Sequence, residues 1–175
     1  MKSLFVAVLL ATTYGVVAAQ AQAANPSRAD KHFVTAAGGA GLAEVQAAQL
    51  ATQKSGRQDV KDFAQRMITD HTKAGDQLKQ IADSEGLSLP TAPGKGDTKA
   101  IAKLQGESGA AFDADYIKGQ RSAHNKAVKL FSKESASGQD ATLKSFAGQT
   151  LPTLQDHQKM IKAMPVKGPG KPSSM

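Results

Sequence analysis

The sequence predicts an all-α protein, a four-helix bundle of ferritin-like arrangement, and three observations lead to this prediction. Apolar residues recur at spacings of three and four along four long segments. Residues that start or stop helices, mainly glycine, proline, serine and aspartate, bound these segments. The middle connection is much longer than the other two. This difference predicts two antiparallel helical hairpins joined by a long crossover that contains a short helix.

The chain begins with the pattern of a secretory signal peptide. Lys2 precedes an uncharged apolar run from Leu4 to Ala19, and small-x-small cleavage patterns end at Ala21 and Ala23. We place the cleavage after Ala23, so residues 1–23 are the predicted signal peptide and residues 24–29 a short leader. The alternative is an uncleaved anchor. The prediction is an exported protein, periplasmic or envelope-associated, with no transmembrane segment after cleavage.

The 152 residues from 24 to 175 are enough for one domain with its own core. The absence of cysteine excludes disulfides, thiol chemistry and iron–sulfur clusters. Without Lys2 the chain has 21 basic and 15 acidic residues, and part of the excess lies near the C-terminus. Residues 165–175 are rich in proline and glycine and are predicted to be a disordered basic tail.

This tail would contact an anionic envelope surface, or else serve only as a solubilising charge. Nucleic acid is not an expected partner, because aromatic residues are scarce and charges of both signs are interspersed.

The predicted bundle domain covers residues 30–164. Its first helix begins at Asp30 and ends near Ser55-Gly56, with Gly56 as the terminating glycine. Its apolar stripe contains one acidic residue, Glu44. The glycines at positions 38, 39 and 41 lower its helix propensity and predict the close approach of a neighbouring helix.

The second helix has the clearest periodicity, from Val60 to Ala82, and ends before Gly86. The 24 residues from Gly86 to Gly109 form the crossover, in which prolines and glycines interrupt regular structure. Asp97 is the expected N-cap of the short helix within it.

The third long helix carries Tyr116 and His124 on its apolar face and ends near Gly138. The fourth has Asp140 as its expected N-cap and contains Pro152. A proline inside a helix removes a backbone hydrogen bond at a cost of about 3 kcal/mol and is expected to kink it.

Four ionisable residues lie on the apolar stripes, one in each long helix: Glu44, His71, His124 and His157. Burial of such groups is unfavourable unless they are paired, hydrogen-bonded or bound to metal. If they converge, the imidazoles and the carboxylate suit one ion of Zn, Fe, Cu or Ni. The alternative is that they lie at different heights and are satisfied by hydrogen bonds.

Three further residues are expected to support this polar core: Tyr116, Asp70 and Asp156. The dipeptides Asp70-His71 and Asp156-His157 place each carboxylate about 100° from the neighbouring ring, so each aspartate would reach a histidine on another helix. If Tyr116 is buried, its hydroxyl needs a partner such as Glu44 or a histidine.

The sequence lacks the ligand pattern of a dinuclear oxidase, in which glutamate lies three residues before histidine. Those positions are Ile68, Arg121 and Leu154. No nucleophile elbow or phosphate-binding loop occurs either. We therefore do not expect an enzyme.

Several motifs together resemble the bacterial domain of unknown function 4142 family over about residues 30–164. They are Phe63-Ala64-Gln65-Arg66-Met67 with Asp70-His71, Phe112-Asp113 with Tyr116 and His124, and Leu151-Pro152 with Leu154 and His157. The resemblance implies a ferritin-like helical bundle without a settled activity, and its polar positions match Glu44, His71, Tyr116, His124 and His157. Members are often labelled predicted outer membrane proteins, which implies an envelope location.

Two hypotheses about function follow. In the first, the protein is an exported, stress-related bundle that binds one metal ion or a small ligand at the Glu/His cluster. In the second, it is a structural or interaction module of the envelope, and its polar core is a hydrogen-bond network that fixes helix register.

Overall fold

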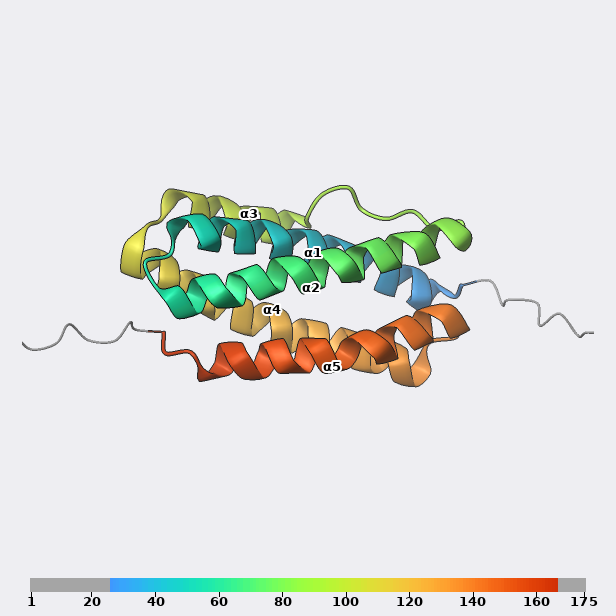
Figure 1. Cartoon of the computed structure of the whole chain (residues 1–175). Helices are drawn as coiled ribbons and strands as arrows, with labels where there is room; N and C mark the ends of the chain where they lie inside the picture. Colours follow the sequence, from blue (N-terminus) through green and yellow to red (C-terminus); the bar gives the residue numbers. More distant parts are fainter. Residues whose placement is uncertain (1–25, 167–175) are drawn as a thin grey trace, which may run out of the picture.

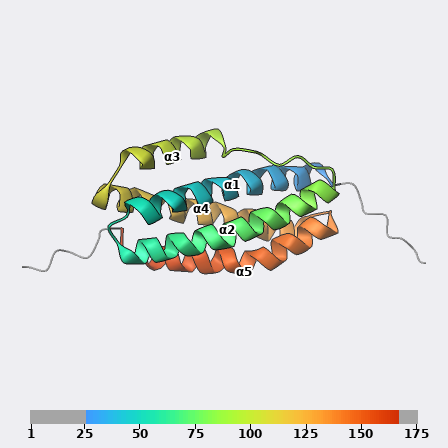
Figure 2. The same cartoon turned by 45° about the horizontal axis from the view of Figure 1, so that its top comes forward.

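The computed structural model describes residues 26–166. The predicted signal peptide and most of the predicted basic tail lie outside this range. The described chain is all-helical, with α1 (Arg28–Lys54), α2 (Gln58–Ser84), α3 (Lys95–Gly106), α4 (Gly109–Ser137) and α5 (Ala141–Ala163). The four long helices lie side by side, and the short α3 lies on the outside against α1 (Figures 1 and 2).

The direction of each helix follows from contacts at the helix ends. Lys54, at the end of α1, donates hydrogen bonds to the carbonyls of Leu104 and Gln105 at the end of α3. Phe33, near the start of α1, packs edge-on against Phe131, near the end of α4, with 5.0 Å between ring centroids. The helix α4 is therefore antiparallel to α1 and parallel to α2. The long connection carries the chain back along α1 before α4 begins (Figure 2).

The core consists of two apolar clusters. The first, the Phe63 cluster, has as its buried members Ala47, Ala48, Ala51, Val60, Phe63, Ala64, Met67, Leu104, Phe112, Tyr116, Ile117 and Ile161. The second, the Phe146 cluster, has as its buried members Phe33, Val34, Ala37, Leu78, Ala82, Phe131, Leu143, Phe146, Ala147 and Leu154.

In every long helix an inward-facing ionisable residue falls between the segments that supply the two clusters. These residues, which we call the polar layer, are Glu44, His71, His124 and His157. The fold therefore brings the candidate ligands to a similar height along the long axis.

The first helix begins two residues earlier than the apolar pattern predicts. Ser27 is the N-cap, because its hydroxyl accepts a hydrogen bond from the backbone N–H of Asp30 at 3.2 Å. The Asp30 carboxylate accepts from the backbone N–H of Ser27 at 2.6 Å, which completes a capping box. The predicted leader thus already contains the first residues of α1.

The predicted helix ends are partly right. The helix α2 ends in a Schellman motif, in which Gly86 has φ +64° and the N–H of Leu87 donates to the carbonyl of Ala82 at 2.8 Å. Asp140 caps α5 by accepting from the N–H of Leu143 at 2.8 Å. Pro152 lies within α5, and the helix continues on both sides of it.

The first helix ends near Ser55, as predicted, but two expected capping residues are wrong. At the end of α1, Gly56 is not among the glycines with positive φ. Instead the chain leaves the helix at Ser55, which is extended and whose hydroxyl donates to Asp113 at 2.5 Å. The short helix begins one turn before the predicted cap, because Gly94 is its N-cap and Asp97 lies in its first turn.

The glycines of α1 face the crossover and open space, and only Gly39 approaches another described helix, at the N-cap Gly94 of α3. A Cβ atom on Gly38 would lie 2.7 Å from Leu89 Cδ2 and 3.1 Å from Pro90 Cδ, both in the crossover. A Cβ atom on Gly41 would meet nothing within 4 Å. Among the described helices, none is long and apolar enough to cross a membrane.

This contrast gives a prediction about two matched substitutions. Gly41→Ala should raise the free energy of unfolding by about 0.5–1 kcal/mol, because alanine is the better helix former and the site is open. Gly38→Ala should not give this gain, because Leu89 and Pro90 must move. Urea unfolding of both variants tests this. Equal gains at the two positions would contradict the packing described here.

Candidate metal centre

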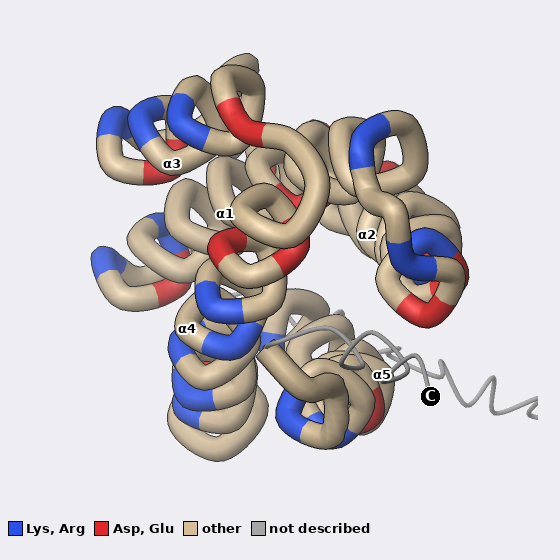
Figure 3. Tube along the Cα trace, turned by 90° about the vertical axis from the view of Figure 1, so that its left-hand side faces the viewer, with Lys and Arg blue, Asp and Glu red and all other residues tan. Residues whose placement is uncertain are grey.

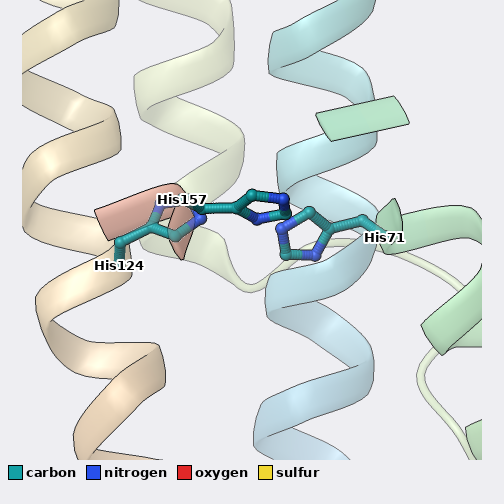
Figure 4. Close-up of side chains that lie close together, drawn as sticks. All are labelled: His71, His124 and His157. Atoms are coloured by element: carbon teal, nitrogen blue, oxygen red, sulfur yellow. The ribbon is translucent and has the colours of Figure 1, made fainter. Parts of the chain in front are cut away.

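Three histidines from three helices meet in the polar layer. His71 belongs to α2, His124 to α4 and His157 to α5 (Figure 4). One ring nitrogen from each lies within 4.8 Å of the others. The ring centroids are 5.8 Å apart for His71 and His124, and 5.5 Å apart for each of the other two pairs.

The surroundings of this group are largely apolar. His124 and His157 are 1% and 0% exposed, whereas His71 is half-buried. The Phe63 ring packs against His124 and His157, with centroid separations of 6.3 and 6.2 Å. The rings are thus packed against the edge of the Phe63 cluster.

Two of the rings are oriented by a hydrogen bond on one of their two nitrogens. His157 Nε2 donates to the Asp70 carboxylate at 2.8 Å. His124 Nδ1 donates to the backbone carbonyl of Gln120 at 3.0 Å. Asp70 therefore contacts a histidine on another helix. These bonds fix the tautomers, so that His157 Nδ1 and His124 Nε2 carry the free lone pairs of the neutral rings.

The remaining nitrogens have no hydrogen-bond partner. His71 Nε2, His124 Nε2 and His157 Nδ1 are all buried and unpaired. Leaving a buried polar atom unpaired costs about 1–3 kcal/mol, so three of them in one group require an explanation. A cation between the rings would use all three lone pairs.

Burial keeps these rings neutral. It lowers the pKa of His71 to about 3, helped by repulsion from His124 and His157 and opposed by Asp70. It lowers the pKa of His124 to about 4, opposed by the hydrogen bond to Gln120. It also lowers the pKa of His157, against the influence of Asp70. The neutral imidazole is the form that binds metal ions, so the site needs no deprotonation near neutral pH.

The distances fit a small ion after a modest closure. Bonds of 2.0–2.1 Å from a tetrahedral ion would place two nitrogens about 3.3 Å apart. The rings would close by up to about 1.5 Å, given that their donor atoms lie within 4.8 Å of one another. Three neutral nitrogen donors suit zinc and its first-row neighbours better than magnesium or calcium.

Glu44 lies in the polar layer and does not belong to the histidine group. It is 7% exposed, and its Oε2 atom has no hydrogen-bond partner. Burial raises the pKa of Glu44 to about 7, while the Gln120 side chain acts in the opposite direction. The four residues that the sequence analysis grouped therefore separate into three histidines and one isolated carboxyl group.

Of the three residues that were expected to support the polar core, only Asp70 contacts the histidine group. Tyr116 is 1% exposed, and burial together with the charge of Glu44 raises its pKa well above 10. Its hydroxyl bonds neither Glu44 nor a histidine. Asp156 does not belong to the polar core. Its side chain is 67% exposed and lies 3.8 Å from Arg66, on the solvent side of α5.

Gln120 has a role that the sequence analysis did not assign. Its carbonyl orients His124, and its side chain lies near Glu44. A signal was present, since glutamine on an apolar stripe one turn before a histidine marks a buried polar neighbour. The carbonyl contact itself has no signature in the sequence.

A cavity of about 1470 Å³ adjoins the site, and Glu44, His71 and His157 are among the residues that line it. The histidine group is therefore accessible from one side, although two of its rings are fully buried.

A family model described as a domain of unknown function (DUF4142) matches residues 15–164. No curated protein matches the chain significantly. No solved structure does so either.

The lowered pKa of His124 predicts a pH dependence of stability in the metal-free protein. The unfolded chain takes up a proton near pH 6.5, whereas the folded chain does so only near pH 4. The unfolded state therefore binds more protons between these values, and stability is lost as the pH falls. Relative to a His124→Leu variant, the wild type should lose up to about 3 kcal/mol between pH 7 and pH 4.

Glu44→Gln provides a control of opposite sign. The folded pKa of Glu44, about 7, lies above its ordinary value of 4.5, so this contribution is lost as the pH rises. Urea unfolding at several pH values measures both differences. A flat difference for His124→Leu would show that His124 is not buried as a neutral ring.

Proposed function

The chain belongs to the domain of unknown function 4142 family, whose description assigns no activity, and we propose that it binds one transition-metal ion through His71, His124 and His157. Two observations carry this proposal: one ring nitrogen from each histidine lies within 4.8 Å of the others, and each ring has a buried nitrogen without a hydrogen-bond partner. No protein group in residues 26–166 hydrogen-bonds these buried nitrogens, whereas one ion would satisfy all three.

The ion is divalent, and zinc suits the site best. Three neutral imidazoles match the histidine sites of zinc enzymes and binding proteins, and a hard oxygen donor is absent from the described group. Asp70 acts as a positioning residue, because it holds His157 with its lone pair toward the ion. Iron, copper and nickel share the nitrogen preference and remain competitors for the same three atoms.

The setting is an exported, ferritin-like bundle. The signal-peptide pattern in residues 1–23 supports export to the periplasm or envelope. The two antiparallel hairpins and the long crossover support the ferritin-like arrangement. The part of the chain that the structure describes contains one group of candidate metal ligands, the three histidines, and no Glu-x-x-His motif. This ligand set favours one ion over a dinuclear centre.

A second candidate is an interaction module that docks on an anionic surface of the envelope. It is supported by exposed lysines on α3 and α4, which Figure 3 shows on the side of the molecule away from α2. Those on α4 are Lys118, Lys126, Lys129 and Lys133. The predicted basic tail would add to this charge. In this candidate the polar layer fixes helix register and needs no ion.

Zinc titration followed by calorimetry and elemental analysis separates the two candidates. The wild type should bind one zinc ion per chain, and the double variant His71→Ala, His157→Ala should bind none. His32→Ala is the matched control, because His32 is exposed and lies outside the group. It should bind as the wild type does. Substoichiometric zinc that the double variant retains would refute the metal proposal.

The role of Asp70 gives a further prediction. Asp70→Asn should keep one zinc per chain and weaken its affinity about 10- to 100-fold, because the ring of His157 loses its carboxylate partner. Asp156→Asn changes the same residue type in the matching dipeptide, yet Asp156 is exposed and contacts Arg66. Its zinc affinity should equal that of the wild type. Equal losses in the two variants would point to a general effect of charge.

A further inference from the structure

The cavity beside the histidine group is not filled by side chains of the described residues. It has a volume of about 1470 Å³ and lies against α1, α2, α4 and α5. Small and apolar residues make up much of its lining, among them Leu78, Ala123, Ala127 and Leu154. Sites for small molecules in proteins are typically concave, mostly apolar and adjacent to a few polar groups.

Three glycines within helices keep this space open. Gly41 on α1, Gly75 on α2 and Gly119 on α4 all line the cavity. A Cβ atom on any of them would meet nothing within 4 Å. Glycine inside a helix is less favourable than alanine, and here no neighbouring atom requires it. By contrast, Gly38 lies against Leu89 and Pro90. The three open glycines therefore enlarge the cavity without serving helix packing.

The histidine group is incomplete on the side of this cavity. Within residues 26–166 no fourth histidine, cysteine or carboxylate joins the three rings. Zinc held by three protein ligands keeps a position for water or another ligand, whereas structural zinc has four protein ligands. His71 and His157 both line the cavity, and His71 is half-buried. A ligand that enters the cavity can therefore reach the ion.

The charge of the lining offsets that of the proposed ion. Its acidic residues outnumber its basic ones. The acidic residues are Glu44, Asp70, Asp76, Asp83 and Asp97, and the basic residues are Lys79 and Lys126. Lys79 and Asp83 form an ion pair 2.6 Å long, and Asp70 is paired with Arg66. The acids that remain offset the double positive charge of the ion, so the cavity offers an anion little net attraction, and its apolar lining favours a neutral ligand.

We infer that the metal ion keeps one exchangeable coordination position open to the cavity, and that this position takes a small, neutral ligand with a nitrogen donor on an apolar body. The inference rests on the proposed function and adds the class of ligand. The step is a substitution: the nitrogen lone pair forms a bond to the ion and a bound water molecule leaves. No oxidant or reductant takes part.

Spectroscopy of the cobalt(II)-loaded protein tests the inference. Cobalt(II) replaces zinc in nitrogen sites, and its visible bands report changes in its ligands. Imidazole and 4-phenylimidazole are the probes, because they share the donor and differ in their apolar body. Both should shift the visible bands, and 4-phenylimidazole should bind at least about tenfold more tightly, since its phenyl group is buried in the cavity.

Variants that fill the cavity locate the ligand. Gly75→Leu and Gly119→Leu should each keep one cobalt per chain and lose the preference for 4-phenylimidazole, so that the affinity ratio falls to about one. Gly148→Leu is the matched control, because Gly148 lies on α5 outside the lining and a Cβ atom there makes only an ordinary contact with Ser135. It should keep the wild-type ratio. Two filling variants are used in case one of them does not fold.

The outcomes separate this inference from the metal proposal. Failure to bind cobalt or zinc would overturn the proposed function itself. One cobalt per chain with bands that neither probe shifts would leave the metal proposal standing and overturn the exchangeable position. Equal affinities for the two probes would overturn the apolar ligand class. A preference that persists in both filling variants would overturn its location in the cavity.

Discussion

The burial of three neutral imidazoles in one layer of an apolar core is the constraint around which this structure is arranged. His124 and His157 lose their hydration there, and the hydrogen bonds from His157 to Asp70 and from His124 to Gln120 compensate on one nitrogen of each ring. A buried nitrogen on each of the three rings has no hydrogen-bond partner among the described residues. This polar layer separates the Phe63 and Phe146 clusters. Its unpaired polar atoms lower the stability of the folded protein unless a bound ion or ligand satisfies them.

The fold supplies the geometry for this layer. Because two hairpins are joined by a crossover, α4 runs parallel to α2, and the polar positions of the long helices reach a similar height between the same two clusters. The long connection has a second effect, since Leu89 and Pro90 cover Gly38 and its loop lines the cavity. The crossover therefore forms part of the wall of the cavity through which the histidines are reached.

Much of this was accessible from the sequence, because helical periodicity reports which face of a helix is buried. It placed Glu44, His71, His124 and His157 on inward faces, and the dipeptide Asp70-His71 indicated a contact with another helix. Periodicity could not show that Glu44 lies outside the histidine group. It indicates which side of a helix a side chain is on, but it does not give the distance between side chains on different helices. Asp156 shows the same limit, since only the packing decides that it faces Arg66 and solvent. The start of α1 at Arg28 depends on the capping box of Ser27 and Asp30, which the apolar pattern does not contain.

X-ray absorption spectroscopy of the zinc-loaded protein tests the central claim most directly, because it reports the donor atoms and their distances. The account predicts three imidazole nitrogens at about 2.0–2.1 Å with one further light donor, and the loss of imidazole scattering in the variant that lacks His71 and His157. A first shell of oxygen donors, or an imidazole count unchanged in that variant, would contradict it. The ion would then lie elsewhere on the chain, and the buried rings would serve the fold alone.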